Sequence, residues 1–494
     1  MSTSLKKTDI IKTICEYAAV VIFGCVFVLV SASWISPIFK DAYGYDSSWY
    51  SMMGRAITMG MVPYRDYFDL KGPVFFFIEA IGQFFCHGRF GVFIIECIAS
   101  SVSYVFIWKI CKLYVKRWQA AIVLLITFFA SIYMFWGGNT CEEYMMPFNY
   151  ACMYFALKYL KDGEYEEYST PAIIFGVSFG VFLLSKVTTC APMGASALTV
   201  VIILIAKKKA RLILPILAYF LLGFVMIFIP VCFYFIFNHA FEDFIYAAFV
   251  FAYRRGTNYY ETFSYDWESK IIICYAGFVA ALLIPVKKVE EHYIKILGLL
   301  LPFITWAALH LGTPYTYYFL LTIPTLVFTL IFIMIYWSGP GRKRIIIQRR
   351  VLWLILLILI FDHYYPDTRN KIRENIDLAK REEDAYVEEC KNVLKYIPEE
   401  EWNNIYDLES GMIFYEVNQL LPANRYPINL PYFLHLNPEI KINVLNYLDI
   451  VRPQYVMSEE MEAFDDQDVK NYVFSHYMLM MDFGAEEVYL RVED

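Results

Sequence analysis

Long apolar runs separated by short polar segments fill most of the chain up to residue 361. A helix that crosses a bilayer needs about 20 mostly apolar residues, and eleven of these runs approach or exceed that length. They are residues 14–38, 90–110, 118–136, 144–160, 171–185, 189–206, 212–237, 269–286, 293–311, 316–337 and 345–361. The pattern predicts a polytopic α-helical membrane protein with about eleven transmembrane helices.

The first polar segment, residues 39–89, contains two shorter apolar patterns. Pro73–Cys86 has only 14 residues and carries Glu79, so we expect an interfacial or re-entrant helix rather than a spanning one. Before it, apolar residues recur at helical spacing from Trp49 to Gly60, with polar residues such as Arg55 opposite. This spacing predicts a second amphipathic helix lying on the membrane.

The loops that carry clustered cations alternate with loops that do not, and this sets the orientation. Cytoplasmic loops are enriched in Lys and Arg. The clusters are Lys6, Lys7, Lys12, Lys109, Lys112, Lys116, Arg117, Lys207–Arg211, Lys287, Lys288 and Arg342–Arg350. We therefore place the N-terminus in the cytoplasm, and the loop 39–89 and the C-terminal region outside. The first run has no small-residue cleavage site and is expected to be a retained helix.

The composition agrees with a membrane protein and excludes some partners. The chain is 59% hydrophobic and 18% charged, with a mean hydropathy of +0.45. After Pro366 there are 27 Asp and Glu against 12 Lys and Arg, so a nucleic-acid partner is not expected. The 11 Cys contain no CxxC pair, and the His are at no metal-ligand spacing. We therefore expect no disulfide framework, required metal or cofactor.

The chain changes character after Pro366. Asn370–Tyr396 is charged and helix-prone, and Trp402–Asp407, Ile413–Tyr415 and Tyr455–Met457 are short strand-like runs between turns. We predict a transmembrane domain, 1–365, and a small extracytoplasmic α/β domain, 366–494.

Carboxylates, cations and aromatic residues gather in the first outer loop, in 41–46 and 60–73. Charged groups at a bilayer are costly and usually functional. We therefore place the active site in this loop.

The motifs of this loop resemble those of a known family. Tyr45-Asp46, Arg55, Gly60, Pro63-Tyr64-Arg65-Asp66, Asp69 and Lys71-Gly72-Pro73 resemble the first-loop signature of bacterial GT-C glycosyltransferases, relatives of protein O-mannosyltransferases and lipid A aminoarabinose transferases. Gly180–Lys186 resembles their short outer turn with a Lys, and Pro314–Pro324 their late aromatic motif, which often has His in place of Tyr317. The resemblance implies a polyprenyl-phosphate-linked sugar donor and an acceptor on the outer face.

Glycosyl transfer from a lipid phosphate needs a carboxylate that takes the acceptor proton and cations that hold the departing phosphate. Asp46 is our candidate base, with Asp41 in reserve, and an inverting reaction needs only one. The alternative for Asp46 is an ordinary helix N-cap.

The candidate phosphate ligands are five cations of the outer loops. Lys71 and Arg65 are the first choice, and Lys186, Arg254 and Arg255 are supplements. The alternatives are contact with lipid headgroups and solvated loop charges.

Other residues of the outer loops have two interpretations each. Asp66, Asp69 and Tyr64 are candidates for sugar binding, although the two carboxylates are equally consistent with pairing to Arg65 and Lys71. Glu142 and Glu143 either orient the acceptor or are solvated. The aromatic loop 238–268 is either a lid or an interfacial belt.

We therefore expect a GT-C-type hexosyl or pentosyl transferase of the cell membrane, whose partners are membrane lipids, a polyprenyl-phosphate-sugar donor and an extracytoplasmic glycan, lipid or protein acceptor. The alternatives are a flippase or transporter of lipid-linked saccharides, which should show ionisable residues along a mid-membrane path, and a non-catalytic membrane subunit.

Overall fold

The computed structural model describes residues 2–254, 272–283, 289–310, 315–338, 343–409, 412–427, 430, 434, 438–484 and 486–492. The chain forms two compact units, each discontinuous in sequence. Unit 1 comprises 1–32, 96–231 and 259–376, and unit 2 comprises 33–95, 232–258 and 377–494. Because the units interleave along the chain, the predicted division at residue 366 stays a prediction.

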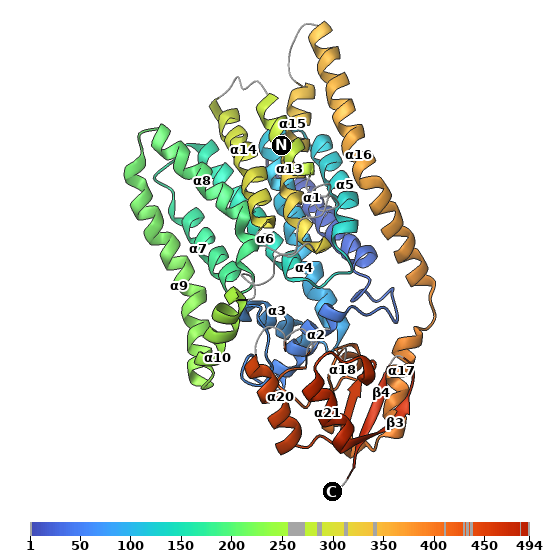
Figure 1. Ribbon diagram of the computed structural model, residues 1–494. Helices are drawn as coiled ribbons and strands as arrows, with labels where there is room; N and C mark the ends of the chain where they lie inside the picture. Colours follow the sequence, from blue (N-terminus) through green and yellow to red (C-terminus); the bar gives the residue numbers. More distant parts are fainter. Residues whose placement is uncertain are drawn as a thin grey trace. The chain divides into compact units, whose positions relative to one another are not determined.

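Unit 1 is built mainly from long apolar helices (Figure 1). A helix occurs at each of the eleven predicted runs. Their bounds are α1 (Ser2–Ser31), α4 (Arg89–Tyr114), α5 (Arg117–Met134), α6 (Cys141–Asp162), α7 (Ser169–Leu183), η1 (Val187–Cys190) with α8 (Ala191–Ala206), η2 (Ala210–Leu212) with α9 (Ile213–Phe237), α13 (Ile272–Leu283), α14 (Val289–Leu309), η4 (Thr316–Thr322) with α15 (Ile323–Ser338), and α16 (Lys343–Lys380). Among the described residues, 7 helices are long and apolar enough to cross a membrane. The helical membrane fold is confirmed, and the count of eleven spans stays a prediction.

Two helix ends differ from the sequence prediction. The first apolar run was predicted to continue to residue 38, but α1 ends at Ser31, because the chain turns before Pro37. The charged segment after Pro366 was predicted as a new helix, but α16 is one continuous helix of 38 residues that passes through Pro366 (Figure 1). α16 ends at Lys380, and a new helix, α17 (Ala385–Val393), follows it. The Asp384 side chain caps α17 by accepting the N–H of Tyr386 at 2.9 Å.

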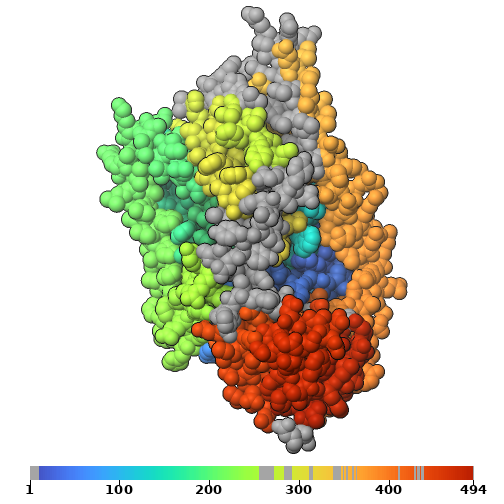
Figure 2. Space-filling model, viewed as in Figure 1, coloured from blue at the N-terminus to red at the C-terminus, as the bar shows by residue number. Residues whose placement is uncertain are grey.

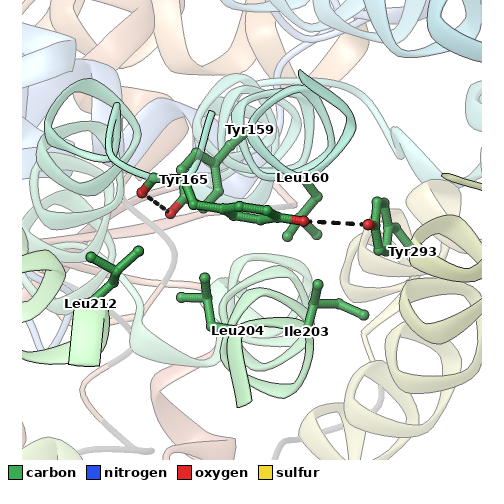
Figure 3. Packing of buried hydrophobic residues seen from close by; sticks show 7 residues of the cluster. All are labelled: Tyr159, Leu160, Tyr165, Ile203, Leu204, Leu212 and Tyr293. Atoms are coloured by element: carbon green, nitrogen blue, oxygen red, sulfur yellow. Dashed lines mark hydrogen bonds between the residues drawn. The ribbon is translucent and has the colours of Figure 1, made fainter. Parts of the chain in front are cut away.

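A buried cluster joins α6, α8 and α14 (Figure 3). Its members are Tyr159, Leu160, Tyr165, Ile203, Leu204, Leu212 and Tyr293. The Tyr159 hydroxyl donates to the carbonyl oxygen of Tyr165 at 2.8 Å, and the Tyr165 and Tyr293 hydroxyls are 3.3 Å apart. The rings thus fill the core while their polar ends remain hydrogen-bonded.

Glycines allow α7 and α9 to pack at short range. A Cβ atom on Gly176 would lie 1.9 Å from the carbonyl oxygen of Phe220, and one on Gly223 would lie 2.3 Å from that of Ile173. Small residues at membrane helix contacts permit such backbone approach. Any larger residue at either position would push the two helices apart.

Unit 2 contains the first outer loop, with α2 (Tyr45–Thr58) packed on α3 (Pro73–Phe85). At 13 residues, α3 is shorter than a spanning helix, and Phe84 and Phe85 at its end are exposed. An amphipathic helix on the membrane would turn its polar side to solvent. This prediction is wrong for α2, because Ser47, Ser51 and Arg55 are buried.

The other elements of unit 2 come from two distant parts of the chain. They are α10 (Phe241–Ile245), the π-helix η3 (Tyr246–Phe251), α17, η5 (Leu394–Tyr396), η6 (Glu399–Asn404), α18 (Met412–Val417), α20 (Pro438–Ile450), η7 (Met461–Ala463), α21 (Gln467–His476) and a four-stranded sheet. The predicted strand at 413–415 is instead part of α18, since a short apolar run does not by itself distinguish strand from helix.

The sheet has the strand order β1-β2-β4-β3. β1 (Ile405–Asp407) is parallel to β2 (Tyr455–Ser458), and β4 (Glu487–Arg491) is antiparallel to both β2 and β3 (Tyr477–Asp482). Tyr406 and Val456 are paired in register and buried. The α/β character of this region is confirmed, although β3 and β4 were not predicted. On the face shown in Figure 2, the residues drawn in red form one continuous surface.

Candidate active site

Asp46 is the second residue of α2, and it is not the cap of that helix. The N-cap is Gly44, which has extended backbone angles and makes no side-chain cap hydrogen bond. A Cβ atom on Gly44 would lie 2.1 Å from the Trp34 ring, so the close approach of this ring explains the glycine. Asp46 itself is half-buried in the first turn, where the helix dipole favours a carboxylate.

Tyr50 lies one turn after Asp46 on α2, so the two side chains share one face of the helix. The Lys71 Nζ lies 4.6 Å from the centroid of the Tyr50 ring. Tyr50 also packs edge-on against Phe75 at 4.7 Å, which fixes the ring from its other side. Lys71 therefore borders the Tyr50 ring, and Asp46 lies one turn earlier on the same face of α2.

The backbone of Lys71 is held on both sides. Its N–H donates to Asp69 Oδ1 at 2.7 Å, and its carbonyl oxygen accepts from the Tyr64 hydroxyl at 2.6 Å. The other Asp69 oxygen accepts from the Trp49 indole N–H of α2. Asp69 thus ties Lys71 to α2 through its backbone N–H rather than through its ammonium group.

Tyr64 and Asp69, which the sequence indicated as candidates for sugar binding, are buried. Tyr64 has 0% exposure and a φ of 70°, and it packs against Phe235 and Phe244. Asp69 has 1% exposure. Burial raises the pKa of the Tyr64 hydroxyl, with a further contribution from Asp69. Both side chains support the loop that carries Lys71, and their role in sugar binding stays a prediction.

Arg65 and Asp66 pair with each other at the surface. The guanidinium donates from Nε to Asp66 Oδ1 and from Nη2 to Oδ2, both at 2.8 Å, and from Nη1 to the Asn238 carbonyl oxygen at 3.0 Å. Although burial alone raises the pKa of Asp66, the bonds from Arg65 and from the Val62 N–H outweigh it and lower the pKa. Arg65 is therefore largely occupied by protein oxygens.

Lys71 differs from Arg65 and Lys186, because among the described residues it forms no ion pair, whereas Arg65 pairs with Asp66 and Lys186 with Glu142. Asp41, the reserve base, has Lys391 Nζ at 3.6 Å. Arg254 is exposed at the end of the helix that follows η3. Arg255, most of the aromatic loop after it and Pro314 lie outside the described residues.

Unit 1 brings together three features that the sequence indicated separately. Lys186 Nζ donates to Glu142 Oε1 and lies 3.4 Å from the Tyr318 ring centroid and 5.7 Å from that of Tyr317. Burial lowers the pKa of Lys186, but the Glu142 carboxylate and Tyr318 outweigh burial, so the pKa lies above its usual range. Lys186 stays cationic and already has a carboxylate partner.

The interpretation of Glu142 and Glu143 as solvated charges is wrong. Glu142 is 1% and Glu143 5% exposed. The carboxylate of Glu143 accepts both the N–H and the hydroxyl of Thr140, at 3.1 Å each, which closes a capping box at the start of α6. Glu143 also lines a cavity together with Glu96 of α4, a residue that we did not single out. Glu96 lies inside the apolar run 90–110, and an acidic residue in such a run is the sequence signal that would have indicated it.

The buried polar side of α2 was also missed. Arg55 Nη1 donates to Glu416 Oε2 of α18 at 2.7 Å, and Ser51 donates to the other Glu416 oxygen at 2.8 Å. Arg55 Nη2 donates to the carbonyl oxygens of Tyr415 and Leu420. The C-terminal part of unit 2 therefore supplies the counter-charge for the helix that carries Asp46.

Among the described residues, no three or more His, Cys, Asp or Glu side chains form a group able to hold a metal ion. Our expectation of no required metal stays a prediction.

The comparisons with known proteins agree with this architecture. A family model of dolichyl-phosphate-mannose-protein mannosyltransferases matches residues 71–234, a stretch that begins at Lys71 and includes Lys186. The chain matches no curated protein in sequence.

Two solved structures are similar over 98% of both chains. One is ArnT from Cupriavidus metallidurans bound to undecaprenyl phosphate, with a TM-score of 0.61 and 9% identity. The other is the same protein in the apo state, with a TM-score of 0.55 and 10% identity. The predicted resemblance is confirmed, and the chain is a multi-pass membrane protein with a GT-C glycosyltransferase fold.

Proposed function

We propose that this protein transfers a sugar from a polyprenyl-phosphate-linked donor to an acceptor on the extracytoplasmic side of the membrane, with inversion at the anomeric carbon. Lys71 carries the proposal. Its backbone is bonded on both sides, its ammonium group lies over the Tyr50 ring without a carboxylate partner among the described residues, and Asp46 lies one turn before Tyr50.

The donor class has two supports. The matching family model describes enzymes named for dolichyl-phosphate-mannose, and the similar ArnT structure holds undecaprenyl phosphate. A lipid phosphate needs a cation at the membrane surface and an apolar path for its tail. Lys71 lies two residues before Pro73, at which the apolar helix α3 begins. We propose that the phosphate binds Lys71 while the tail follows the bilayer.

The proposed reaction is a single displacement. The Asp46 carboxylate takes the proton of an acceptor hydroxyl as the acceptor oxygen bonds to the anomeric carbon. The bond between that carbon and the phosphate oxygen breaks, and the lipid phosphate leaves with the electron pair. Lys71 stabilises the charge that develops on this oxygen, because a fixed cation in a partly dehydrated site favours the transition state.

The remaining candidates take secondary roles in the proposal. Arg65 orients the loop through Asp66 and adds positive potential near the phosphate. Lys186, already paired with Glu142, is a weaker candidate for the phosphate, and Arg254 and Arg255 stay candidates for donor contact. The orientation with a cytoplasmic N-terminus and external loops, and the transfer of a hexose or pentose, are likewise part of the proposal.

The transporter alternative requires a path for a saccharide. The buried pair Glu96 and Glu143 provides ionisable groups inside the helical unit, as a transporter would. The cavity that they line has a volume of about 50 Å³, on the order of one or two water molecules. This cavity does not accommodate a sugar and so gives no support to transport.

Asp46→Asn tests the assignment of the base. The purified protein should fold, bind polyprenyl phosphate normally and lose turnover by about a hundredfold or more, the usual scale for a general base. Asp41→Asn is the matched control and should retain most activity, because Asp41 pairs with Lys391. Near-normal transfer by Asp46→Asn would remove Asp46 from the mechanism, and flipping of a labelled lipid-linked saccharide without transfer would replace the proposed function.

A further inference from the structure

Arg89, the first residue of α4, donates hydrogen bonds to four backbone carbonyl oxygens of the segment before α2. Its Nη1 donates to the carbonyl oxygens of Trp34 at 3.2 Å and Ala42 at 2.6 Å, and its Nη2 donates to those of Phe39 at 3.3 Å and Lys40. Arg89 and all four acceptors belong to unit 2. A single nitrogen, Nη1, therefore joins the two ends of this segment.

The position of Arg89 is unusual for a cation and explains why it must have partners. The helix dipole is positive at the start of a helix, so a cation there is unfavourable. Residues 32–44 contain neither helix nor strand, so their carbonyl oxygens need other donors. The planar guanidinium carries two N–H groups on each Nη atom, which suits several acceptors at once. An Arg at a membrane surface often only contacts lipid headgroups, but this guanidinium is occupied by the protein backbone.

Arg89 also contacts the residue that precedes the cap of α2. Its guanidinium lies 4.1 Å from the centroid of the Tyr43 ring. The next residue, Gly44, is the N-cap of α2, makes no side-chain cap hydrogen bond and packs against the Trp34 ring. A helix start without a side-chain cap depends on the residues before it. The first turn of α2, which contains Asp46, therefore depends on the turn that Arg89 holds.

The other half of α2 has a separate anchor. Ser51 and Arg55 bond to Glu416 at 2.8 and 2.7 Å and are buried. Loss of Arg89 should therefore leave the C-terminal half of α2 packed and loosen only its first turn. This separation makes the role of Arg89 measurable apart from the fold of the helix.

We infer that Arg89 is a positioning residue for Asp46. By holding the turn before α2, it fixes the place of the carboxylate that takes the proton of the acceptor. The inference rests on the proposed function, because it is the reaction that requires this carboxylate at a defined place. A displacement of about 1 Å at a reacting group can lower a rate by about a hundredfold.

Hydrogen exchange of the purified full chain tests the first step without any assay of transfer. In Arg89→Met, the amides of residues 39–48 should exchange about tenfold faster or more, because each lost bond to a charged donor lowers the cost of local opening. Those of β2 should exchange as in wild type. Arg452→Met is the matched control, because exposed Arg452 also donates to a backbone carbonyl oxygen, that of Asp449 at 3.1 Å, and it should leave 39–48 unchanged. Equal exchange of 39–48 in wild type and Arg89→Met would overturn the inference.

Turnover of a polyprenyl-phosphate-linked sugar tests the second step. Arg89→Met should lower kcat by about tenfold or more and change the affinity for polyprenyl phosphate by less than about twofold, since the orientation of the base is lost and not the donor site. When Asp46→Asn is already present, Arg89→Met should cause no further loss, because residues that act as a unit are not additive. Additive losses, or a loss of lipid affinity as large as the loss of kcat, would mean that Arg89 only supports the fold and would overturn the inference.

Arg89→Lys covers the case in which Arg89→Met does not fold. It keeps the cation but not the planar pair of donors, so it should show faster exchange of 39–48 and a lower kcat, both to a smaller degree than Arg89→Met. Wild-type exchange and turnover in Arg89→Lys would overturn the inference. Failure of the proposed function gives a different result, since near-normal turnover of Asp46→Asn would remove the base itself, whatever the exchange of the turn.

Discussion

Arg55 of α2 and Glu416 of α18 form an ion pair of 2.7 Å between side chains that are 5% and 1% exposed, although 361 residues separate them in sequence. Four further hydrogen bonds surround the pair, from Ser51 to Glu416 and from Arg55 to Tyr415, Leu420 and Gln419. The helix that carries the candidate base is thus held by a charge supplied near the other end of the chain.

The first prediction concerns this pair. Removing one partner of a buried ion pair leaves an uncompensated charge and costs about 3 to 5 kcal/mol. Arg55→Met and Glu416→Met should each lower the free energy of unfolding by that amount, and the double variant by clearly less than the sum. Chemical denaturation of the purified proteins measures the cycle.

The exposed pair Lys158 and Asp162 on α6 is the control, because such surface pairs contribute only about 0.3 to 0.5 kcal/mol. Additive effects of the two methionine substitutions would show that Arg55 and Glu416 do not interact energetically.

The second prediction concerns donor binding. If Lys71 holds the lipid phosphate, Lys71→Ala should weaken binding of polyprenyl phosphate by about thirtyfold or more, since losing one partner of a partly dehydrated charge pair costs about 2 to 5 kcal/mol. Titration of the purified proteins with the lipid measures the affinities. Lys395→Ala, at an exposed lysine of the C-terminal domain, is the control. Equal affinities of wild type and Lys71→Ala would leave Lys71 as a headgroup contact.

The third prediction concerns orientation. The cationic loops place Lys208 in the cytoplasm and Asn403 outside. A cysteine introduced at Asn403 should therefore react with a membrane-impermeant thiol reagent in intact cells, and one at Lys208 should not. The background should carry Cys15→Ser, because Cys15 is exposed. Labelling at Lys208 and not at Asn403 would reverse the topology.

The fourth prediction concerns pH. Burial raises the pKa of Glu409 above its usual value of 4.5, despite hydrogen bonds from Ser458 and from the N–H of Glu459. Protonation therefore favours the folded state. The contribution of Glu409 to stability is fully present below pH 4.5 and is lost as the pH rises through its folded pKa.

Glu409→Gln should remove this dependence, so that wild type loses more stability than the variant between pH 4.5 and pH 7. Hydrogen exchange of the neighbouring strand β2 in the full chain measures the difference. Parallel pH profiles for the two proteins would contradict the prediction.

The length of the apolar runs predicted the membrane helices, and the motifs of the first outer loop predicted its candidate residues. Both kinds of feature depend on local sequence. The bonds of Asp69 to Trp49 and Lys71, and of Tyr64 to Lys71, are local as well, but the sequence did not distinguish supporting side chains from those that face a ligand. Burial separated Tyr64 and Asp69 from Lys71, and burial depends on tertiary packing.

The polar side of α2 shows the same limit at longer range. The spacing of Ser47, Ser51 and Arg55 is that of a solvated helix face. Its partner Glu416 lies in a domain whose topology the sequence did not specify, and no local pattern indicates such a pairing. Lys186 and Glu142 were each noted separately, yet their contact follows only from the packing of their helices.

The distance in sequence between Arg55 and Glu416 has a consequence for synthesis. A ribosome adds about 5 to 20 residues per second, so the stretch from Arg55 to Glu416, a separation of 361 positions, takes about 20 to 70 seconds to make. During that interval α2 is present without its counter-charge, and a chain interrupted before α18 never acquires it. The packing of α2 is therefore complete only after the C-terminal part of unit 2 has been translated.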